Sequence, residues 1–142
     1  GATTITASYQ GLSTTATVQV SVAGTWTFTG ANGTTLTWVL TQTGGLVGGT
    51  FTLAPNGTVT FSTTAVRGTL NGTTFTWTMT ATIGSDADRP ECAGATPIYD
   101  GSAQLLSGGA GMTATVATAT GTCDPVLAAA VPAGLVATFT RR

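Results

Sequence analysis

Apolar side chains recur at every second position through most of residues 24–83. Successive residues of a β-strand point to opposite faces of a sheet, whereas an amphipathic helix repeats its apolar residues every three or four positions. Threonine occupies most of the intervening positions. The pattern therefore predicts a sheet with one apolar face and one face covered by hydroxyl groups. The residues that carry it are Trp26, Phe28, Leu36, Trp38, Leu40, Val47, Phe51, Leu53, Val59, Phe61, Val66, Leu70, Phe75, Trp77 and Met79.

Turn dipeptides separate these apolar runs. Asn-Gly readily adopts the positive φ angles of a type I′ turn, which joins neighbouring antiparallel strands. The sequence therefore predicts an antiparallel meander. The dipeptides are Asn32-Gly33, Gly44-Gly45, Asn56-Gly57 and Asn71-Gly72.

Further strands are expected over residues 103–106, 112–119 and 135–140. With an N-terminal hairpin the total is roughly nine or ten strands, enough for a closed barrel or for two facing sheets. Asp124-Pro125 precedes an apolar run and predicts one short helical turn, because Asp is a good N-cap and Pro suits the first helical position. The fold class is thus an all-β antiparallel meander barrel or sandwich.

Composition excludes several classes of function. The 142 residues suit one domain with one core. Four scattered Arg residues, with no Lys and no His, cannot supply the basic field that nucleic acids require. No apolar run is long enough for a membrane-spanning helix, so we expect no membrane insertion. Without His or Lys the usual acid, base and nucleophile arrangements are missing, so we expect no enzyme and no cofactor.

The two cysteines, Cys92 and Cys123, predict a disulfide. The threonine-rich, almost uncharged composition is typical of secreted surface proteins, and disulfides persist in oxidising compartments. We therefore expect an extracellular or cell-surface location. The alternatives are two buried free thiols in a reducing compartment, or a metal site, which two Cys without His would serve poorly.

Residues 1–22 form a separate unit in this interpretation, and residues 23–142 form the barrel domain. The text TITASYQGLSTTATVQVSV predicts a hairpin around Gln10-Gly11. It resembles the closing strands of a bacterial immunoglobulin-like (type 2) module of surface proteins and adhesins, a fold of around seven strands. The resemblance implies either a piece of a longer surface protein or a hairpin adopted by the following domain. The residues that carry it are Ile5, Ala7, Tyr9, Gly11, Ala16, Val18 and Val20.

An isolated hairpin is marginally stable and has unpaired edges, so it must pair with something. The partner is either the meander of its own chain or a neighbouring subunit or domain, as in donor-strand complementation. The candidate self-assembly residues are Ile5, Tyr9, Val18, Val20 and Val22.

A second resemblance covers residues 24–83 and, more loosely, the C-terminal ATFTRR. A Gly-x-Trp entry strand, a Leu-Thr-Gln-x-Gly hairpin and a Gly-Thr-x-x-Gly strand pair are similar to small bacterial lipocalin-like or avidin-like meander barrels. This resemblance implies a barrel and assigns no binding residue. The matching positions are Gly24, Trp26, Leu40, Thr41, Gln42, Gly44, Gly68 and Gly72.

Residues 84–101 interrupt the alternation and are expected to form a long ordered loop held by Cys92. Asp86, Asp88 and Glu91 offer oxygen ligands for calcium, but EF-hand spacing is absent and Arg89 lies among them, so a solvated acidic loop is the favoured interpretation.

Three Asn-Gly-Thr triplets match the N-glycosylation pattern, and hairpin turns explain them without a sugar. They begin at Asn32, Asn56 and Asn71.

The aromatic residues allow two interpretations. They alternate in phase with the other apolar residues, which favours core packing. They could instead line an enclosed pocket for a small hydrophobic ligand or a carbohydrate. The residues concerned are Trp26, Trp38, Trp77, Phe28 and Phe75.

Together these observations predict a non-enzymatic structural subunit of a bacterial surface fibre or adhesin, joined to its neighbours by strand pairing through the N-terminal hairpin. The alternatives are a ligand-binding barrel and a spacer domain of a longer adhesin.

Overall fold

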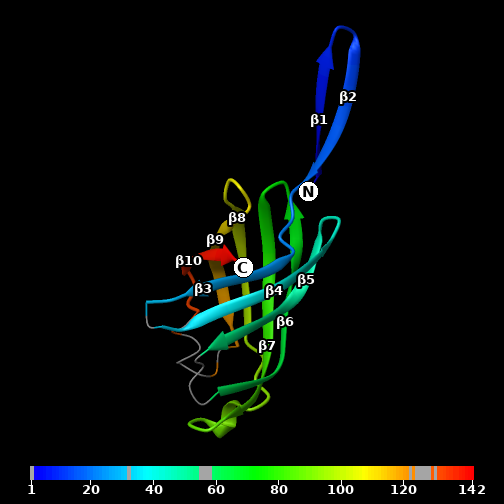
Figure 1. Ribbon diagram of the computed structural model, residues 1–142. Coiled ribbons are helices and arrows are strands. Elements are labelled where there is room, and N and C mark those ends of the chain that lie inside the picture. The colour runs from blue at the N-terminus through cyan, green and yellow to red at the C-terminus, as the bar shows by residue number, and fades with distance from the viewer. Residues whose placement is uncertain (1, 32, 55–58, 122, 124–128, 130) are drawn as a thin grey trace.

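A computed structural model describes residues 2–31, 33–54, 59–121, 123, 129 and 131–142, with only the backbone of residues 2, 3 and 17–19. It is an all-β structure with one short 3₁₀ turn, η1 (Pro90–Cys92) (Figure 1). The strands are β1 (Ala2–Tyr9), β2 (Leu12–Gln19), β3 (Gly24–Thr29), β4 (Thr35–Thr43), β5 (Leu46–Ala54), β6 (Val59–Asn71), β7 (Thr74–Asp86), β8 (Ile98–Leu105), β9 (Gly111–Thr120) and β10 (Val136–Arg141).

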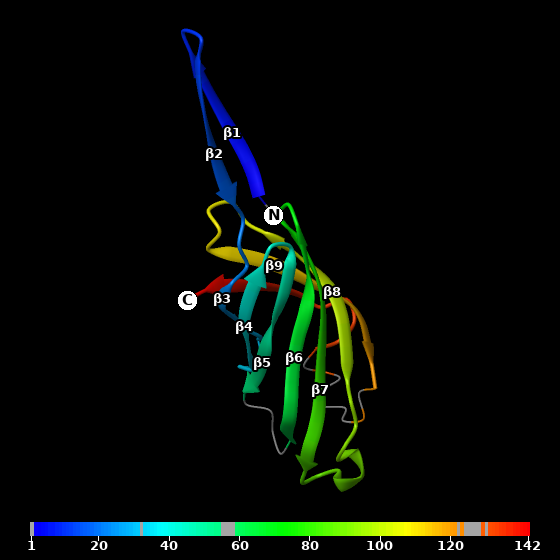
Figure 2. The same cartoon turned by 90° about the vertical axis from the view of Figure 1, so that its right-hand side faces the viewer.

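Strands β3 to β10 form a closed antiparallel barrel in which each strand pairs with its neighbours in the chain. β10 closes the barrel by pairing Thr140 with Thr27 and Arg141 with Trp26 of β3. β1 and β2 form a separate two-stranded sheet that extends beyond one end of the barrel (Figures 1 and 2). The predicted meander barrel and N-terminal hairpin are confirmed, and the barrel replaces the alternative of a sandwich.

The two faces of the barrel wall have the predicted chemistry. Along β7, Phe75, Trp77 and Met79 are buried while the threonines between them are exposed or half-buried. Threonine hydroxyls on the outer face bond across the strands, as between Thr69 and Thr76 at 2.9 Å. Burial of the apolar residues drives closure, since each large side chain contributes about 1.5–3 kcal/mol when removed from water.

β6 is a single long strand with an irregularity at its start. The register between β6 and β7 shifts on both sides of Phe61, and Ser62 has no paired position in the ladder. An extra residue in one strand reverses which face the following side chains occupy. This shift explains why apolar residues fall at odd positions up to Phe61 and at even positions from Val66 to Leu70.

Two of the tight turns differ from the type I′ expectation. Asn71 is the last residue of β6 and pairs with Thr74, so Gly72 and Thr73 are the two central turn residues. Gly72 has φ 59° and Thr73 does not have positive φ, which is the sign pattern of type II′. The Gly44-Gly45 turn, with φ 61° at Gly44 alone, is similar. Asn32 and Asn56 lie outside the described residues.

The expected loop over residues 84–101 is shorter than predicted. β7 continues to Asp86, and β8 begins at Ile98, where pairing of Thr80 with Ile98 and of Met79 with Tyr99 extends the sheet. The acidic and proline-rich composition suggested a loop here. Asp100 instead lies within β8, on the outer wall of the barrel.

The predicted disulfide is confirmed. Cys92, buried in η1, is bonded to Cys123 with 5.6 Å between their Cα atoms. The helical turn expected after Asp124-Pro125 lies almost wholly outside the described residues. No helix in the described part of the chain is long and apolar enough to cross a membrane.

Two interior glycines make room for aromatic rings. Gly68 and Gly101 are the cross-strand partners of Trp77 on either side of β7. A Cβ at Gly101 would lie 2.3 Å from Cζ2 of Trp77 and 2.2 Å from the carbonyl oxygen of Thr115. A Cβ at Gly68 would lie 2.8 Å from Cε2 of Phe75. The missing Cβ atoms of these glycines therefore leave room for the rings of Trp77 and Phe75.

We expect Gly101→Ala to lower the free energy of unfolding by about 1–3 kcal/mol, the usual cost of forcing an extra carbon into a packed core. Urea denaturation followed by tryptophan fluorescence measures it. Gly48→Ala is the matched control, because its new Cβ would meet nothing closer than Oγ1 of Thr41 at 3.9 Å. Equal stability of the two variants would show that Trp77 does not need the bare backbone of Gly101.

Candidate functional site

The N-terminal hairpin has two chemically different faces. The register pairs Tyr9 with Leu12 and Ile5 with Ala16, which places these residues on one apolar face. The side chains of Ile5, Tyr9 and Leu12 are 55%, 75% and 77% exposed. Exposed apolar residues gathered on one side of an element mark an interaction surface. The opposite face carries hydroxyl groups from Thr4, Thr6, Ser8, Ser13 and Thr15.

Both long edges of the hairpin lack a strand partner within the described residues, since β1 and β2 pair only with each other. Tyr9 and Leu12 flank a two-residue turn and form a hydrogen-bonded pair, and such pairs alternate along an antiparallel ladder. The outward backbone groups of β1 therefore belong to Thr4, Thr6 and Ser8. The barrel of the same chain, one of the two partners considered from the sequence, leaves these edges unpaired.

A short linker, residues 20–23, joins the hairpin to the barrel. Val22 is 0% exposed and belongs to the core. Its N–H donates to Oε1 of Gln42 at 2.9 Å, and its carbonyl accepts from Nε1 of Trp26 at 2.7 Å. Nε2 of Gln42 also donates to the carbonyl of Val20 at 3.3 Å. The linker is therefore part of the barrel structure.

Arg141 of β10 and the following Arg142 also form hydrogen bonds at the linker and the start of β3. The guanidinium of Arg141 donates to the carbonyl of Ala23, and its Cζ lies 5.5 Å from the centre of the Trp26 ring. The backbone N–H of Arg142 donates to Thr25 at 3.0 Å. The two ends of the barrel sequence thus meet at the point where the hairpin begins.

The predicted self-assembly residues fall into two groups. Ile5 and Tyr9 are exposed on the apolar face of the hairpin, whereas Val22 is buried in the barrel and Val20 is half-buried against it. The side chain of Val18 lies outside the description. Leu12, which the sequence analysis did not select, is the most exposed apolar residue of the hairpin, and its position beside the Gln10-Gly11 turn was the available signal.

Three of the candidate ligand-lining aromatics, Trp38, Trp77 and Phe75, pack together inside the barrel, and Phe28 lies 5.8 Å from Phe139. Trp38 stacks on Phe139 with ring centres 4.5 Å apart, and it lies 5.2 Å from Trp77 and 6.3 Å from Phe75. A hollow beside Phe28 at one end of the barrel has a volume of about 20 Å³, close to that of a single water. Trp38, Trp77 and Phe75 therefore pack with Phe139 in the barrel interior.

The three indole N–H groups of the barrel interior differ in their hydrogen bonding. Nε1 of Trp38 and Nε1 of Trp77 are buried and have no hydrogen-bond partner in the described part of the chain. Nε1 of Trp26, in contrast, is bonded to Val22. A buried hydrogen bond stabilises a fold chiefly because its loss leaves the other partner unsatisfied.

The acidic side chains of the described residues have separate surroundings. Oδ1 of Asp86 accepts the backbone N–H groups of Asp88 and Arg89, each at 3.0 Å, and so shapes the loop before η1. Glu91 is exposed in η1. No group of three or more Cys, Asp or Glu side chains among the described residues could hold a metal ion.

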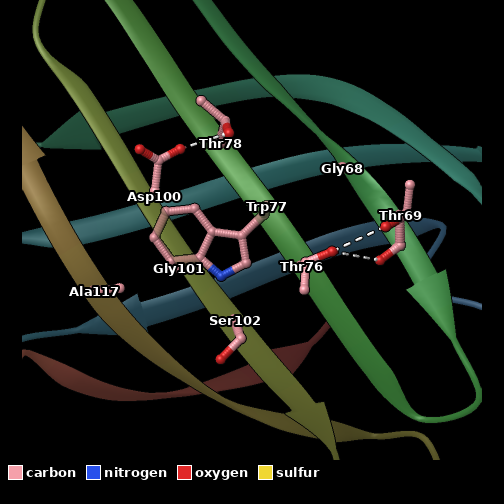
Figure 3. A pocket seen from close by; sticks show the side chains of 9 residues that line it. All are labelled: Gly68, Thr69, Thr76, Trp77, Thr78, Asp100, Gly101, Ser102 and Ala117. Atoms are coloured by element: carbon pink, nitrogen blue, oxygen red, sulfur yellow. Dashed lines mark hydrogen bonds between the residues drawn. The ribbon is translucent and has the colours of Figure 1, made fainter.

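A shallow depression of about 470 Å³ lies over Gly68 and Gly101, with the indole of Trp77 across Gly101 (Figure 3). Asp100 borders it and accepts hydrogen bonds from Thr78 at 2.6 Å and Thr118 at 3.2 Å. The carboxylate is thus already bound to neighbouring hydroxyl groups, an arrangement that stabilises the outer wall.

The pairing between β5 and β6 is incomplete. It extends only from Leu46–Thr69 to Gly49–Val66. Beyond this point residues 50–54 of β5 pair only with β4, and residues 61 and 63–65 of β6 pair only with β7, as far as the described residues show. We call these two facing segments the β5–β6 seam.

The phase of the ladder shows which backbone groups point into the seam. The N–H of Leu70 donates to the carbonyl of Gly45 at 2.8 Å, and hydrogen-bonding positions alternate along each strand. Phe51 and Leu53 of β5 and Thr64 of β6 therefore direct their backbone N–H and C=O groups into the seam. Sequence reasoning missed the seam because strand pairing is non-local.

No protein-family model matches this chain, and neither a curated protein nor a solved structure matches it.

We expect Trp26→Phe to destabilise the protein by about 1–3 kcal/mol more than Trp38→Phe, because only the former removes a hydrogen bond and leaves the carbonyl of Val22 unsatisfied. Both side chains are almost completely buried, so the lost packing is comparable. Thermal and urea unfolding of the two variants measures the difference. A larger cost for Trp38→Phe would contradict this assignment.

Proposed function

We propose that this protein is a non-enzymatic structural subunit of an extracellular assembly, joined to its neighbour through the N-terminal hairpin. The observation that carries the proposal is the hairpin itself, which offers an exposed apolar face and two unpaired edges. Isolated two-stranded hairpins are marginal in water, and an added strand on each edge would stabilise this one.

The linker supports this role. Val22, Gln42 and Trp26 bond the linker at the base of the hairpin to the barrel, and the hairpin extends outward from that point (Figure 2). Anchoring the base lowers the entropy that the hairpin loses when it binds. The disulfide between Cys92 and Cys123 supports an extracellular location, where such bonds persist.

The hairpin has no charged side chain, which also supports strand pairing with a neighbour. The first charged residue of the whole chain is Arg67. Proteins that must avoid edge-to-edge pairing usually protect their edge strands with Lys or other charges. The edges of β1 and β2 carry no such protection.

The ligand-binding alternative has weaker support. The unpartnered indole N–H groups of Trp38 and Trp77 are polar groups that a ligand could satisfy, but the rings of Phe75 and Phe139 pack directly against Trp38. We therefore favour the assembly role, in which these rings stabilise the barrel.

We expect the full chain to form regular polymers, and a chain of residues 20–142, which keeps the linker of residues 20–23, to remain a folded monomer. Size-exclusion chromatography with light scattering and negative-stain electron microscopy measure the assembly. Near-ultraviolet circular dichroism checks the fold of the shortened barrel. A monodisperse full-length monomer, or polymers that persist without the hairpin, would overturn the proposal.

A matched pair of substitutions tests the apolar face within the full chain. Ile5→Glu places a charge on that face, and Thr4→Glu places it on the hydroxyl face one residue away. We expect Ile5→Glu to abolish association and Thr4→Glu to retain it, because burying an unpaired carboxylate is costly. The same light-scattering measurement compares them, and equal behaviour of the two variants would contradict an apolar contact.

A further inference from the structure

We propose that the hairpins of successive copies of this chain pair edge to edge into a continuous cross-β ribbon, β1 with β1 of one neighbour and β2 with β2 of the other. This inference rests on the proposed function and adds to it the partner of the hairpin and the geometry of the joint. Each contact is a two-fold pairing of a strand with its own copy. Because each copy has two such contacts, the pairing continues from copy to copy.

The hairpin has the composition of segments that form cross-β assemblies. Residues 2–19 contain no charged residue and no Pro, and their one Gly lies in the turn. Segments of this kind stack through backbone hydrogen bonds, with their strands perpendicular to the fibre axis. An uncharged strand with an open edge is therefore suited to pairing with further copies of itself.

The phase of β1 permits a two-fold contact. Its outward backbone groups belong to Thr4, Thr6 and Ser8, because the residues between them bond to β2. An axis at Thr6 sets this residue opposite Thr6 of the neighbouring copy, and sets Thr4 opposite Ser8. Residues directly opposite each other share a face of the sheet. The hydroxyl face therefore continues into a hydroxyl face, and the face of Ile5 and Tyr9 into an apolar face.

β2 offers the same chemistry on the other edge. Its outward backbone groups include those of Ser13 and Thr15, and an axis at Thr15 sets this residue opposite Thr15 of the next copy. The barrel wall already contains contacts of this kind, since Thr63 and Thr82 are paired across β6 and β7 and their hydroxyl groups are 2.9 Å apart. Both edges of the hairpin can therefore pair with their own copies.

The width of the barrel favours this alternating order. Both contacts are antiparallel, so consecutive barrels lie on opposite sides of the ribbon, and barrels on one side are four strands, or about 19 Å, apart. Eight strands at the same spacing, tilted by about 40°, close into a ring about 16 Å across. Sheet twist of about 20–25° per strand separates the barrels further. Pairing β1 with β2 of the next copy would set barrels only about 10 Å apart, and they would overlap.

The apolar faces of two ribbons then cover each other. A single hairpin face is eight residues long and two strands wide, which is about 26 Å by 10 Å. Two such faces bury much less than the roughly 1,200 Å² of a stable interface. A ribbon repeats the exposed side chains of Ile5, Tyr9 and Leu12 at every copy, so the contact grows with its length. Edge pairing therefore precedes face stacking.

The β5–β6 seam is a poorer partner for β1. The rings of Phe51 and Phe61 already meet across it, with their centres 6.0 Å apart. Phe51 and Leu53 direct their backbone groups into the seam and their side chains into the core. Pairing with β1 would set its hydroxyl side chains beside these two buried residues and leave Ile5 outside.

Single-cysteine variants and a short bis-maleimide test the register of the β1 contact. We expect Thr6→Cys to form a cross-linked dimer by itself, because the axis sets the two side chains about 5 Å apart. Thr4→Cys is the matched control, since its two copies would lie about 14 Å apart and give no cross-link. A mixture of Thr4→Cys and Ser8→Cys should give the heterodimer. All three positions are exposed.

Proline substitutions remove one edge at a time. Thr6→Pro removes an outward N–H of β1 and leaves the internal ladder bonds of its neighbours, and Thr15→Pro does the same for β2. We expect each variant to stop at small discrete oligomers, because one edge joins only two copies, and the double variant to stay monomeric. All three should keep the unfolding midpoint of the barrel, since the hairpin forms a separate sheet.

X-ray diffraction from oriented polymers of the full chain tests the ribbon itself. Strands stacked perpendicular to the fibre axis give a meridional reflection at about 4.7–4.8 Å. Polymers without this reflection, polymers formed by Thr6→Pro, or a cross-link of Thr6→Cys to Thr15→Cys alone would overturn the alternating ribbon while the fibre role stands. A full-length chain that never associates would overturn both.

Discussion

Backbone hydrogen bonding is the constraint on which this structure depends. Strand edges left unpaired are costly, and closing eight strands into a ring satisfies most of them at once. The alternation of apolar and threonine residues then fills the interior with rings and covers the exterior with hydroxyl groups. Two places do not follow this solution, the hairpin and the β5–β6 seam. In the described residues, both leave backbone groups without a strand partner.

Most of the barrel could be predicted from sequence because its information is local. A period of two, interrupted by glycine-containing turns, determines which residues of β3, β4 and β7 are buried. The errors arose where a local pattern has two structural meanings. Ser62 adds a residue to β6, and only the pairing with β7 reveals it. Asp100 suggested a loop, yet it lies on strand β8, where its carboxylate accepts hydrogen bonds from Thr78 and Thr118.

The candidate site was only half predictable. An apolar hairpin face is visible in the sequence, but the same alternation continues into Val20 and Val22, which belong to the barrel. Sequence spacing cannot show where one sheet ends and the next begins. The seam was invisible for a related reason, since it is defined by pairs that β5 and β6 fail to make. Non-local pairing decides such features, and a single sequence carries little record of it.

The linker has a mechanical consequence. In the proposed assembly, tension that enters through the hairpin would reach the barrel at Val22. There it meets the bonds from Gln42 and Trp26 and the contact of Arg141 with Ala23. Because Arg141 belongs to the last strand, the pull is shared at once between the first and last strands of the barrel. The closure of the ring therefore sets how much force one subunit can bear.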